Sequence, residues 1–374
     1  MTQERVFSSS WTEYEWKFVL LHQIDRWECN DILLEQMARN NKQKIIYLDQ
    51  FAASKMVDEE GLWKEAKDLL VEAVNRHKVI CPIPMEHYVE TGGRNREFAI
   101  KQDDFFRSIS GGKRFRFWEE IVADEIMYYT KFKNNKPKYS TYLRNLDDYH
   151  DFKDEDFYDS LLKLKQEYTK MKEEEKEAIN QIRKIIRDVN SNKSEKESEI
   201  KCKDGIKEMA KTKKQNAEIM QKALPFTIAK SYVDTFRGIA AGDKLPGNTM
   251  VIQCHKSQRI AFLLCLKRFT GFNFYSASKE FEKNAFRNIP SLNTYYGLQF
   301  FYALNQMNET INDDVDLERI SSGIVISDIM FTDKRQKYRI EQLGLDKQYK
   351  TLLFSANDVD IKSFINEMKR IIER

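Results

Sequence analysis

A strand–helix–strand pattern over residues 44–83 constrains the fold of this chain more than any other feature. Residues 44–51 (KIIYLDQF) are a short apolar run that delivers Asp49 at its end. Apolar residues recur at helical spacing over residues 58–76, and residues 77–83 (HKVICPI) form a second apolar run. Two strands joined by a helix of this length are a parallel crossover unit. The pattern therefore predicts an α/β core with a parallel sheet.

A second apolar run that ends in an aspartate lies near the carboxyl terminus. Residues 324–328 (IVISD) repeat the first pattern, with Asp328 at the end of the run and Asp333 five residues later. Carboxylates at the carboxyl edge of parallel strands repel one another unless they share a cation. We therefore expect Asp49 and Asp328 to belong to one divalent-metal site.

The residues after Asp333 extend the α/β pattern. They predict a helix near 335–343, a strand at 349–355 and a final helix over 360–372. Residues 355–358 (SAND) supply cap residues for this last helix.

Composition disfavours several classes of protein. Charged residues make up 32% of the 374 residues, and no apolar run approaches the roughly 20 residues that span a bilayer. The first residues lack the apolar segment of a secretory signal, so we expect a cytoplasmic protein with no membrane partner. The five cysteines form no CxxC pair, which disfavours a zinc knuckle and a disulfide framework. A net charge of +3 neither requires nor excludes a polyanionic partner.

The middle of the chain predicts a long helical hairpin. There is no proline between Pro137 and Pro225, and Gly205 is the only glycine there. Apolar residues follow steps of three and four from Leu161 to Val189, which is a heptad seam, and a weaker helical run follows a polar stretch. We expect an antiparallel coiled-coil hairpin that is inserted into the α/β core, because the acidic runs lie on both sides of it.

These features divide the chain into four expected segments. A helical extension occupies residues 1–42, the first part of the core 43–150, the hairpin insertion 151–224, and the second part of the core 225–374.

Two further acidic motifs add candidate site residues. Glu86 and Glu90 lie four residues apart, on one face of a helix expected after the second strand. Residues 312–318 (NDDVDLE) begin another expected helix and contain Asp313 and Asp316.

Each acidic motif alone has an ordinary structural interpretation. An aspartate at a strand end commonly caps a turn, glutamates four residues apart commonly line a solvated helix face, and acids suit a helix N-terminus. Their order along the chain, each after a strand or at a helix start, favours a shared site. His87, between the two glutamates, is expected to be a packed or capping histidine.

Three of these motifs resemble those of the PIN-like nuclease family. Residues 47–50 (YLDQ), 84–91 (PMEHYVET) and 327–334 (SDIMFTDK) are similar to the first, second and last acidic motifs of that family, and the run at 313–316 stands where the third is expected. The resemblance covers about residues 43–130 and 225–350. It implies a three-layer PIN-like α/β core that hydrolyses phosphodiester bonds, with RNA favoured over DNA.

The implied chemistry uses one or two Mg²⁺ or Mn²⁺ ions, which polarise a phosphate and lower the pKa of a bound water. We expect Asp333 to be a further catalytic residue beside four metal ligands, namely Asp49, Glu90, Asp316 and Asp328. Glu86 and Asp313 are the closest substitutes. The sequence does not decide between Glu86 and Glu90, because both face the same way.

Residues 111–118 (GGKRFRFW) combine three cations with three aromatic rings, a mixture suited to phosphates and unstacked bases. Lys113, Arg114 and Arg116 are therefore candidate substrate-binding residues. The alternative is an amphipathic helix that buries Phe115 and Trp118 and leaves the cations in water. A Walker phosphate loop is excluded, because an arginine follows the lysine where serine or threonine is required.

The sequence thus favours a metal-dependent nuclease, acting as a regulated toxin or an antiphage effector, whose hairpin binds a regulatory protein or a second copy of the chain. The first alternative is a non-catalytic interaction protein that works through the hairpin. A DNA-directed nuclease and a phosphatase for small phosphate esters are further alternatives.

Overall fold

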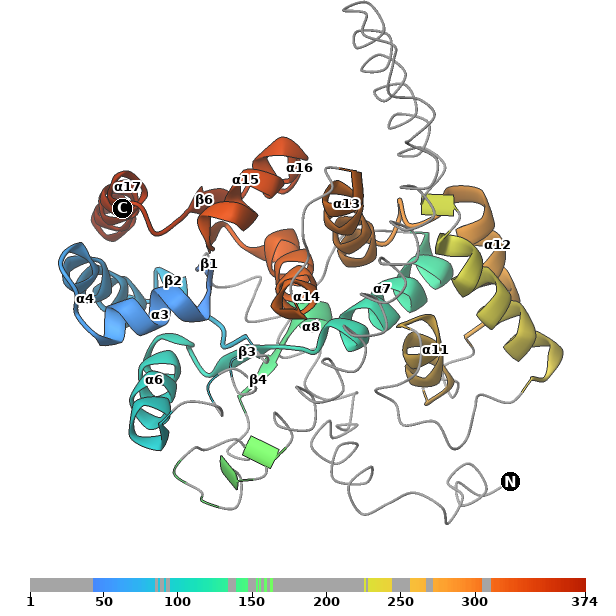
Figure 1. Ribbon diagram of the computed structural model, residues 1–374, viewed down its shortest axis with the longest axis horizontal. Helices are drawn as coiled ribbons and strands as arrows, with labels where there is room; N and C mark the ends of the chain where they lie inside the picture. Colours follow the sequence, from blue (N-terminus) through green and yellow to red (C-terminus); the bar gives the residue numbers. More distant parts are fainter. Residues whose placement is uncertain are drawn as a thin grey trace, which may run out of the picture.

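The computed structural model describes residues 43–84, 87, 91, 95–133, 139–146, 153, 155, 158–159, 162–163, 225–226, 228–243, 256–266, 272–304 and 311–374. The described part is a mixed α/β protein that is mostly helical and contains a small parallel sheet (Figure 1). The expected helical extension and nearly all of the expected hairpin lie outside the described residues.

Four strands form the parallel sheet in the order β2-β1-β5-β6. Their bounds are Lys44–Leu48 for β1, Val79–Ile80 for β2, Ile329–Phe331 for β5 and Leu352–Phe354 for β6. β1 pairs in parallel with both β2 and β5, and β5 pairs in parallel with β6. The predicted parallel crossover is therefore confirmed.

A fifth strand adjoins the sheet beyond β2. Strand β3 (Lys113–Phe115) makes an isolated parallel bridge with Ile83, which follows β2. The Ile83 amide donates to the Lys113 carbonyl, and the Phe115 amide donates to the Ile83 carbonyl. β3 also pairs antiparallel with β4 (Leu143–Asn145).

Both faces of β1 are buried, which explains why its sequence is a continuous apolar run. Ile45 and Tyr47 belong to one hydrophobic core, and Ile46 and Leu48 belong to the other. This alternation is the period of two that a strand imposes on its side chains.

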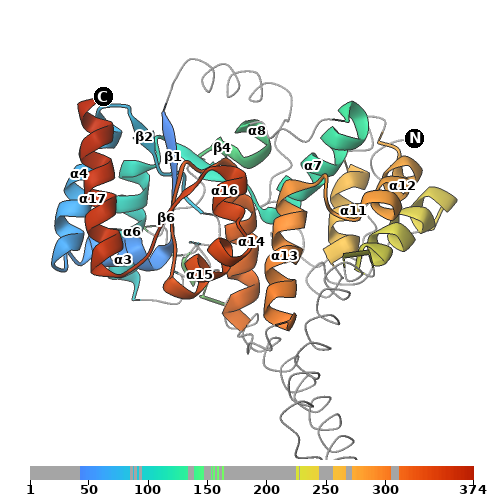
Figure 2. The ribbon, with the colours of Figure 1, turned by 90° about the horizontal axis from the view of Figure 1, so that it is seen from above.

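Helices cover each face of the sheet (Figure 2). One face packs against α3 (Gln50–Val57), α4 (Leu62–Asn75), α6 (Arg96–Ile109) and α17 (Asp358–Glu373). The other face packs against α14 (Ile311–Ile326) and the helices beyond it. The predicted final helix is confirmed as α17, and Asn357 caps it by accepting from the Asp360 amide.

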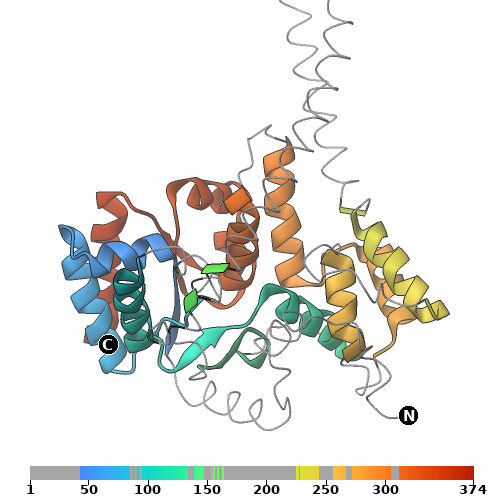
Figure 3. The same cartoon turned by 60° about the horizontal axis from the view of Figure 1, so that its bottom comes forward.

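A helical group extends this second layer. It consists of α7 (Trp118–Phe132), α11 (Lys256–Leu266), α12 (Phe274–Asn284), α13 (Pro290–Leu304) and the helical residues 228–241. α7 leads from the sheet into this group (Figures 1 and 3). Aromatic side chains fill its centre, where Tyr232 stacks on Phe281 and Phe286 stacks on Tyr296.

The prediction of a strand that ends at Asp328 is wrong. Residues 324–326 are the last turn of α14, and β5 begins only after Asp328, at Ile329. Ile324 is fully buried, as a residue of a helix or of a strand would be. A short apolar run does not distinguish a buried helix end from a buried strand.

Gly323 allows α14 to approach β1 closely. A Cβ atom at this position would lie 2.6 Å from Cδ2 of Tyr47 and 3.1 Å from Cε of Met330. We expect Gly323→Ala to lower the free energy of unfolding by about 1–3 kcal/mol through overpacking. Urea denaturation measures this change.

Gly297→Ala in α13 is the matched control, because a Cβ atom there would meet nothing within 4 Å. Alanine is the better helix former, so this variant should gain about 0.5–1 kcal/mol. Equal effects of the two substitutions would contradict the close approach of α14 to β1.

Candidate functional site

The strand order places a topological switch point between β1 and β5. From β1 the chain crosses to β2 on one side, and from β5 it crosses to β6 on the other. In open α/β sheets, ligands bind in the crevice outside the carboxyl ends of the strands at such a point. The residues that follow these two strands are Asp49 after β1 and Thr332 and Asp333 after β5.

Asp49 directs its carboxylate toward the end of β5. Its amide donates to the Phe331 carbonyl over 3.1 Å, and its carbonyl accepts from the first turn of α3. It therefore stands at the N-cap position of α3, yet its side chain makes no capping hydrogen bond. Instead, Asp49 Oδ2 accepts a long hydrogen bond of 3.5 Å from Thr332 Oγ1.

Asp333 is held at the same edge by its own helix, α15 (Lys334–Gln342). Asp333 Oδ1 accepts from the backbone amides of Arg335 at 2.7 Å and Gln336 at 2.9 Å. This N-cap fixes the carboxylate, and the helix dipole favours its negative charge.

Asp316 lies on the stripe of α14 that faces the sheet. It precedes Gly323 by seven residues, so the two share one helix face. α14 ends at the amino edge of the sheet, so Asp316 lies about 10 Å nearer the carboxyl edge than Gly323. Arg319, which is buried, forms an ion pair with Asp316. Along the strand direction, Asp316 therefore lies nearer to Asp49 than Gly323 does. The ion pair with Arg319 balances part of the negative charge of Asp316.

Asp328 lies at the opposite edge of the sheet. Its Oδ2 accepts from the Ile45 amide at 2.9 Å, and its Oδ1 is 3.3 Å from Nζ of Lys44. Asp49 is four residues beyond Ile45 along β1, which is about 13 Å. Asp328 therefore cannot share an ion with Asp49, and the expected pairing of these two residues is wrong. Asp333 occupies the position that was expected for Asp328.

Glu86 and Glu90 lie outside the described residues, as does the side chain of Asp313. Their expected roles stay predictions, and so does the choice between Glu86 and Glu90.

The donor set matches the chemistry of Mg²⁺ or Mn²⁺ in part. Such ions take carboxylate oxygens, keep several waters, and are often bound by only one or two carboxylates together with substrate phosphates. Asp49 and Asp333 supply carboxylates of this kind. Within the described residues, no three His, Cys, Asp or Glu side chains gather closely enough to hold a metal ion.

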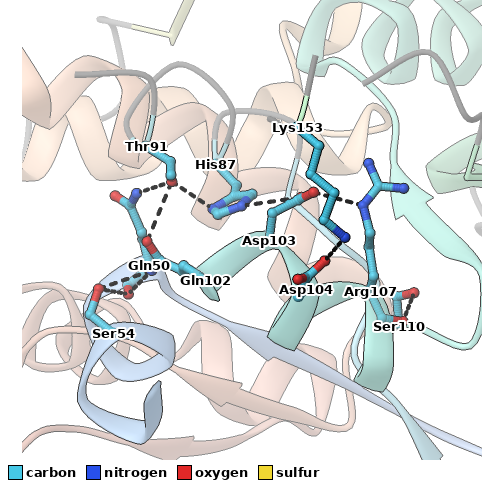
Figure 4. Close-up of polar contacts among 10 residues, drawn as sticks. All are labelled: Gln50, Ser54, His87, Thr91, Gln102, Asp103, Asp104, Arg107, Ser110 and Lys153. Carbon is cyan, nitrogen blue, oxygen red and sulfur yellow. Dashed lines mark hydrogen bonds and ion pairs between the residues drawn. The ribbon is translucent and has the colours of Figure 1, made fainter. Parts of the chain in front are cut away.

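A buried polar chain lies behind Asp49 (Figure 4). Gln50 Nε2 donates to Thr91 Oγ1 over 2.6 Å, and Thr91 Oγ1 is 3.0 Å from Nδ1 of His87. His87 Nε2 lies 3.7 Å from Oδ1 of Asp103, whose Oδ2 accepts from Arg107 Nε at 2.7 Å.

The hydroxyl of Thr91, the imidazole of His87 and the carboxylate of Asp103 follow one another as the groups of a hydrolytic triad do. The burial of these three side chains excludes a hydrolytic role. Thr91 is 0% exposed, and His87 and Asp103 are each 1% exposed, so no substrate reaches the hydroxyl. The prediction that His87 is a packed histidine is confirmed.

The same chain anchors the backbone beside the candidate acids. Gln102 Nε2 donates to the Gln50 carbonyl at 3.1 Å and to Ser54 Oγ at 2.9 Å (Figure 4). Gln50 directly follows Asp49, and Thr91 directly follows Glu90 in the sequence. Sequence reasoning missed Gln50 and Gln102, since their contacts join segments 41 to 52 residues apart. It also missed Asp103, which meets His87 across 16 residues.

The basic segment at 113–116 is placed differently from either expectation. It forms strand β3 rather than a helix, and it buries its arginines together with Phe115. Arg116 is 7% exposed, forms an ion pair with Asp124 and donates to the Ser140 carbonyl at 3.0 Å. Arg114 is 3% exposed.

These arginines are therefore not positioned to meet a substrate phosphate. The alternative expectation, an amphipathic helix that leaves all three cations in water, is also wrong. Lys113 is half-buried, donates to Asn145 Oδ1 at 2.5 Å, and has its pKa lowered by this burial. Phe115 and Trp118 are buried, as the alternative expected.

No protein-family model matches the chain, and no curated protein or solved structure is significantly similar to it. In the described part of the chain, no helix combines the length and the apolar character that crossing a membrane requires.

Proposed function

We propose that this chain is a divalent-metal-dependent nuclease with a PIN-like core, whose site is the carboxyl edge between β1 and β5. One observation carries the proposal: Asp49 and Asp333 follow the two central strands at the switch point of the sheet. The order β2-β1-β5-β6, with helices on both faces, supports the PIN-like core.

The roles of the residues follow from their anchoring. Asp49 and Asp333 hold the cation, which supplies charge to polarise a phosphate and to lower the pKa of a water. Both carboxylates are oriented before a cation arrives, Asp49 by Thr332 and Asp333 by the first turn of α15. Such preorganisation is what makes an electrostatic site effective. Asp316 and either Glu86 or Glu90 complete the acidic set in this proposal.

RNA is the proposed substrate, because the acidic motifs resemble a family that acts mainly on RNA. A cytoplasmic toxin or antiphage effector, restrained by a partner that binds residues 155–223, is the proposed setting. The competing hypothesis is a non-catalytic interaction protein in which the edge acids hold no metal.

Metal binding separates these two hypotheses. We expect Mn²⁺ at 100 times its dissociation constant to raise the free energy of unfolding of the wild-type protein by about 2.7 kcal/mol. Asp49→Asn should lose this gain, because a neutral amide is a poorer ligand and relieves the repulsion between acids. The wild-type protein should cleave labelled single-stranded RNA with Mn²⁺ or Mg²⁺ and not with EDTA, and Asp49→Asn should not cleave it.

Thermal unfolding with and without Mn²⁺ is the measurement, and single-stranded and duplex DNA are the substrate controls. An equal Mn²⁺ effect on the wild-type protein and Asp49→Asn would exclude this site. No Mn²⁺ effect and no cleavage of any polymer would favour the interaction protein.

A further inference from the structure

Two of the most exposed large apolar side chains lie at adjoining helix ends. Phe132, near the end of α7, is 56% exposed, and Tyr275, near the start of α12, is 53% exposed. Lys133 and Glu280 join the two helices through an ion pair of 3.4 Å. Glu280 is five residues from Tyr275, about 7.5 Å along the helix. Figures 1 and 2 both draw the end of α7 beside α12.

Each of these rings is accompanied by a lysine. Lys131 Nζ lies 5.3 Å from the centroid of Phe132, and Lys279 Nζ lies 4.5 Å from that of Tyr275. Both lysines are exposed, and neither forms an ion pair with a carboxylate of the described residues. Phe132 also packs on Tyr128, with ring centroids 4.9 Å apart.

We propose that these side chains form a docking surface for single-stranded RNA. This lysine–aromatic surface consists of Tyr128, Lys131, Phe132, Tyr275 and Lys279. Exposed rings stack with unpaired bases, and neighbouring cations bind the phosphates between them. The choice of RNA rests on the function proposed above.

The chemistry of the surface favours a nucleic acid over an apolar protein partner. A protein interface depletes charge at its centre, whereas here each exposed ring has beside it a lysine that pairs with no carboxylate of the described residues. Duplex nucleic acid is a poorer match, because its bases are already stacked and offer no face to a ring.

The position of the surface requires a polymer. α7 is about 22 Å long. Its first residue, Trp118, donates from Nε1 to Ser321 Oγ of α14 over 2.8 Å, and α14 carries Asp316. The lysine–aromatic surface thus lies about one helix length from this contact with α14, the helix that carries Asp316. A strand of several nucleotides reaches both places, and a mononucleotide does not.

The test is the affinity of the full-length protein for a labelled single-stranded RNA of about 16 nucleotides, the upper range of single-strand site sizes. Fluorescence anisotropy in EDTA, over a series of salt concentrations, measures binding without cleavage. Phe132→Ala/Tyr275→Ala should raise Kd by at least about tenfold with an unchanged salt slope. Lys131→Gln/Lys279→Gln should reduce the slope of log K against log salt by about 1.4.

Two variants control this experiment. Leu352→Ala removes an apolar side chain that is 44% exposed on β6, and it should leave Kd unchanged. Phe132→Tyr/Tyr275→Phe keeps both rings and should bind as the wild-type protein does. Thermal unfolding shows that each variant is folded.

A wild-type Kd in the ring variant would overturn the docking surface, whatever the Kd of the lysine variant. So would a wild-type protein that binds no RNA, or that binds single-stranded DNA alone. Binding that depends on the rings, without cleavage in Mn²⁺, would support the surface and refute the nuclease. Cleavage in Mn²⁺ together with binding that does not depend on the rings would support the nuclease and refute the docking surface.

Discussion

Asp333→Asn is expected to reduce metal-dependent cleavage by on the order of 10²–10³-fold, the loss seen when one electrostatic group of an active site is removed. Asp328→Asn should retain activity near the wild-type level, because Asp328 lies at the amino edge beside Ile45. The two aspartates are five residues apart in one motif, and only the fold distinguishes them. Initial rates of RNA cleavage in Mn²⁺ measure the difference.

The pair is matched in stability as well as in chemistry. Asparagine caps helices about as well as aspartate, so Asp333→Asn keeps the start of α15. Asp328→Asn keeps an acceptor for the Ile45 amide and loses an ion pair with Lys44 that is about 40% exposed, which is worth about 0–1 kcal/mol. A greater loss of cleavage activity in Asp328→Asn than in Asp333→Asn would place the site at the amino edge of the sheet. Full activity in both variants would remove the switch point from consideration.

The sequence predicted the core of the sheet because its signals there are local. The apolar run of β1, the amphipathic face of α4 and the run at Val79 fix a parallel crossover without knowledge of distant contacts. Asn357 likewise predicts the start of α17, because the cap and the amide that it binds are only three residues apart. In these places, propensity, periodicity and capping chemistry agree.

Asp328 was misplaced because a helix and a strand meet within one apolar run. Residues 324–326 are buried as the end of α14, and residues 329–331 are buried as β5. Periodicity cannot locate the boundary between two buried segments of this length. An error of a few residues there moves an acid from one edge of the sheet to the other.

Arg116 was misplaced because a run of cations is ordinarily solvated. Here Glu120 and Asp124, four and eight residues further along α7, compensate the buried guanidinium. Acids at helical spacing after the run were the available signal. The chain that links Gln50, Thr91 and His87 had no such local signal.

Glu125, a residue of α7, is a buried acid outside the candidate site. Its carboxylate lies at the amino end of α13. Its carboxylate accepts from the amide of Ser291 at 2.9 Å, from Ser291 Oγ at 2.7 Å and from the hydroxyl of Tyr142 at 2.5 Å. Tyr349, which donates to or accepts from Thr294 at 3.0 Å, is the other titratable group nearby. Among the residues that the structure describes, no cation pairs with this carboxylate, so only these hydrogen-bonding dipoles and the helix stabilise its charge.

Burial raises the pKa of Glu125 to about 7 from its ordinary value of 4.5, although the hydrogen bonds from Tyr142 and Ser291 oppose this. Between these two values the folded protein binds more protons than the unfolded chain does. The free energy of unfolding therefore falls as pH rises from 4.5 to about 7, by up to about 3 kcal/mol.

Glu125→Gln removes this titration and keeps an oxygen that accepts from Ser291 and Tyr142. We expect the variant to unfold at a higher temperature than the wild-type protein at about pH 8, and at a similar temperature at about pH 4.5. Glu120→Gln is the control, because Glu120 is as buried as Glu125 but pairs with Arg144 at 2.8 Å. Breaking that buried pair should destabilise the protein at about pH 8. If Glu125→Gln instead lowered the melting temperature at about pH 8, the three hydrogen bonds would outweigh the cost of burying the charge.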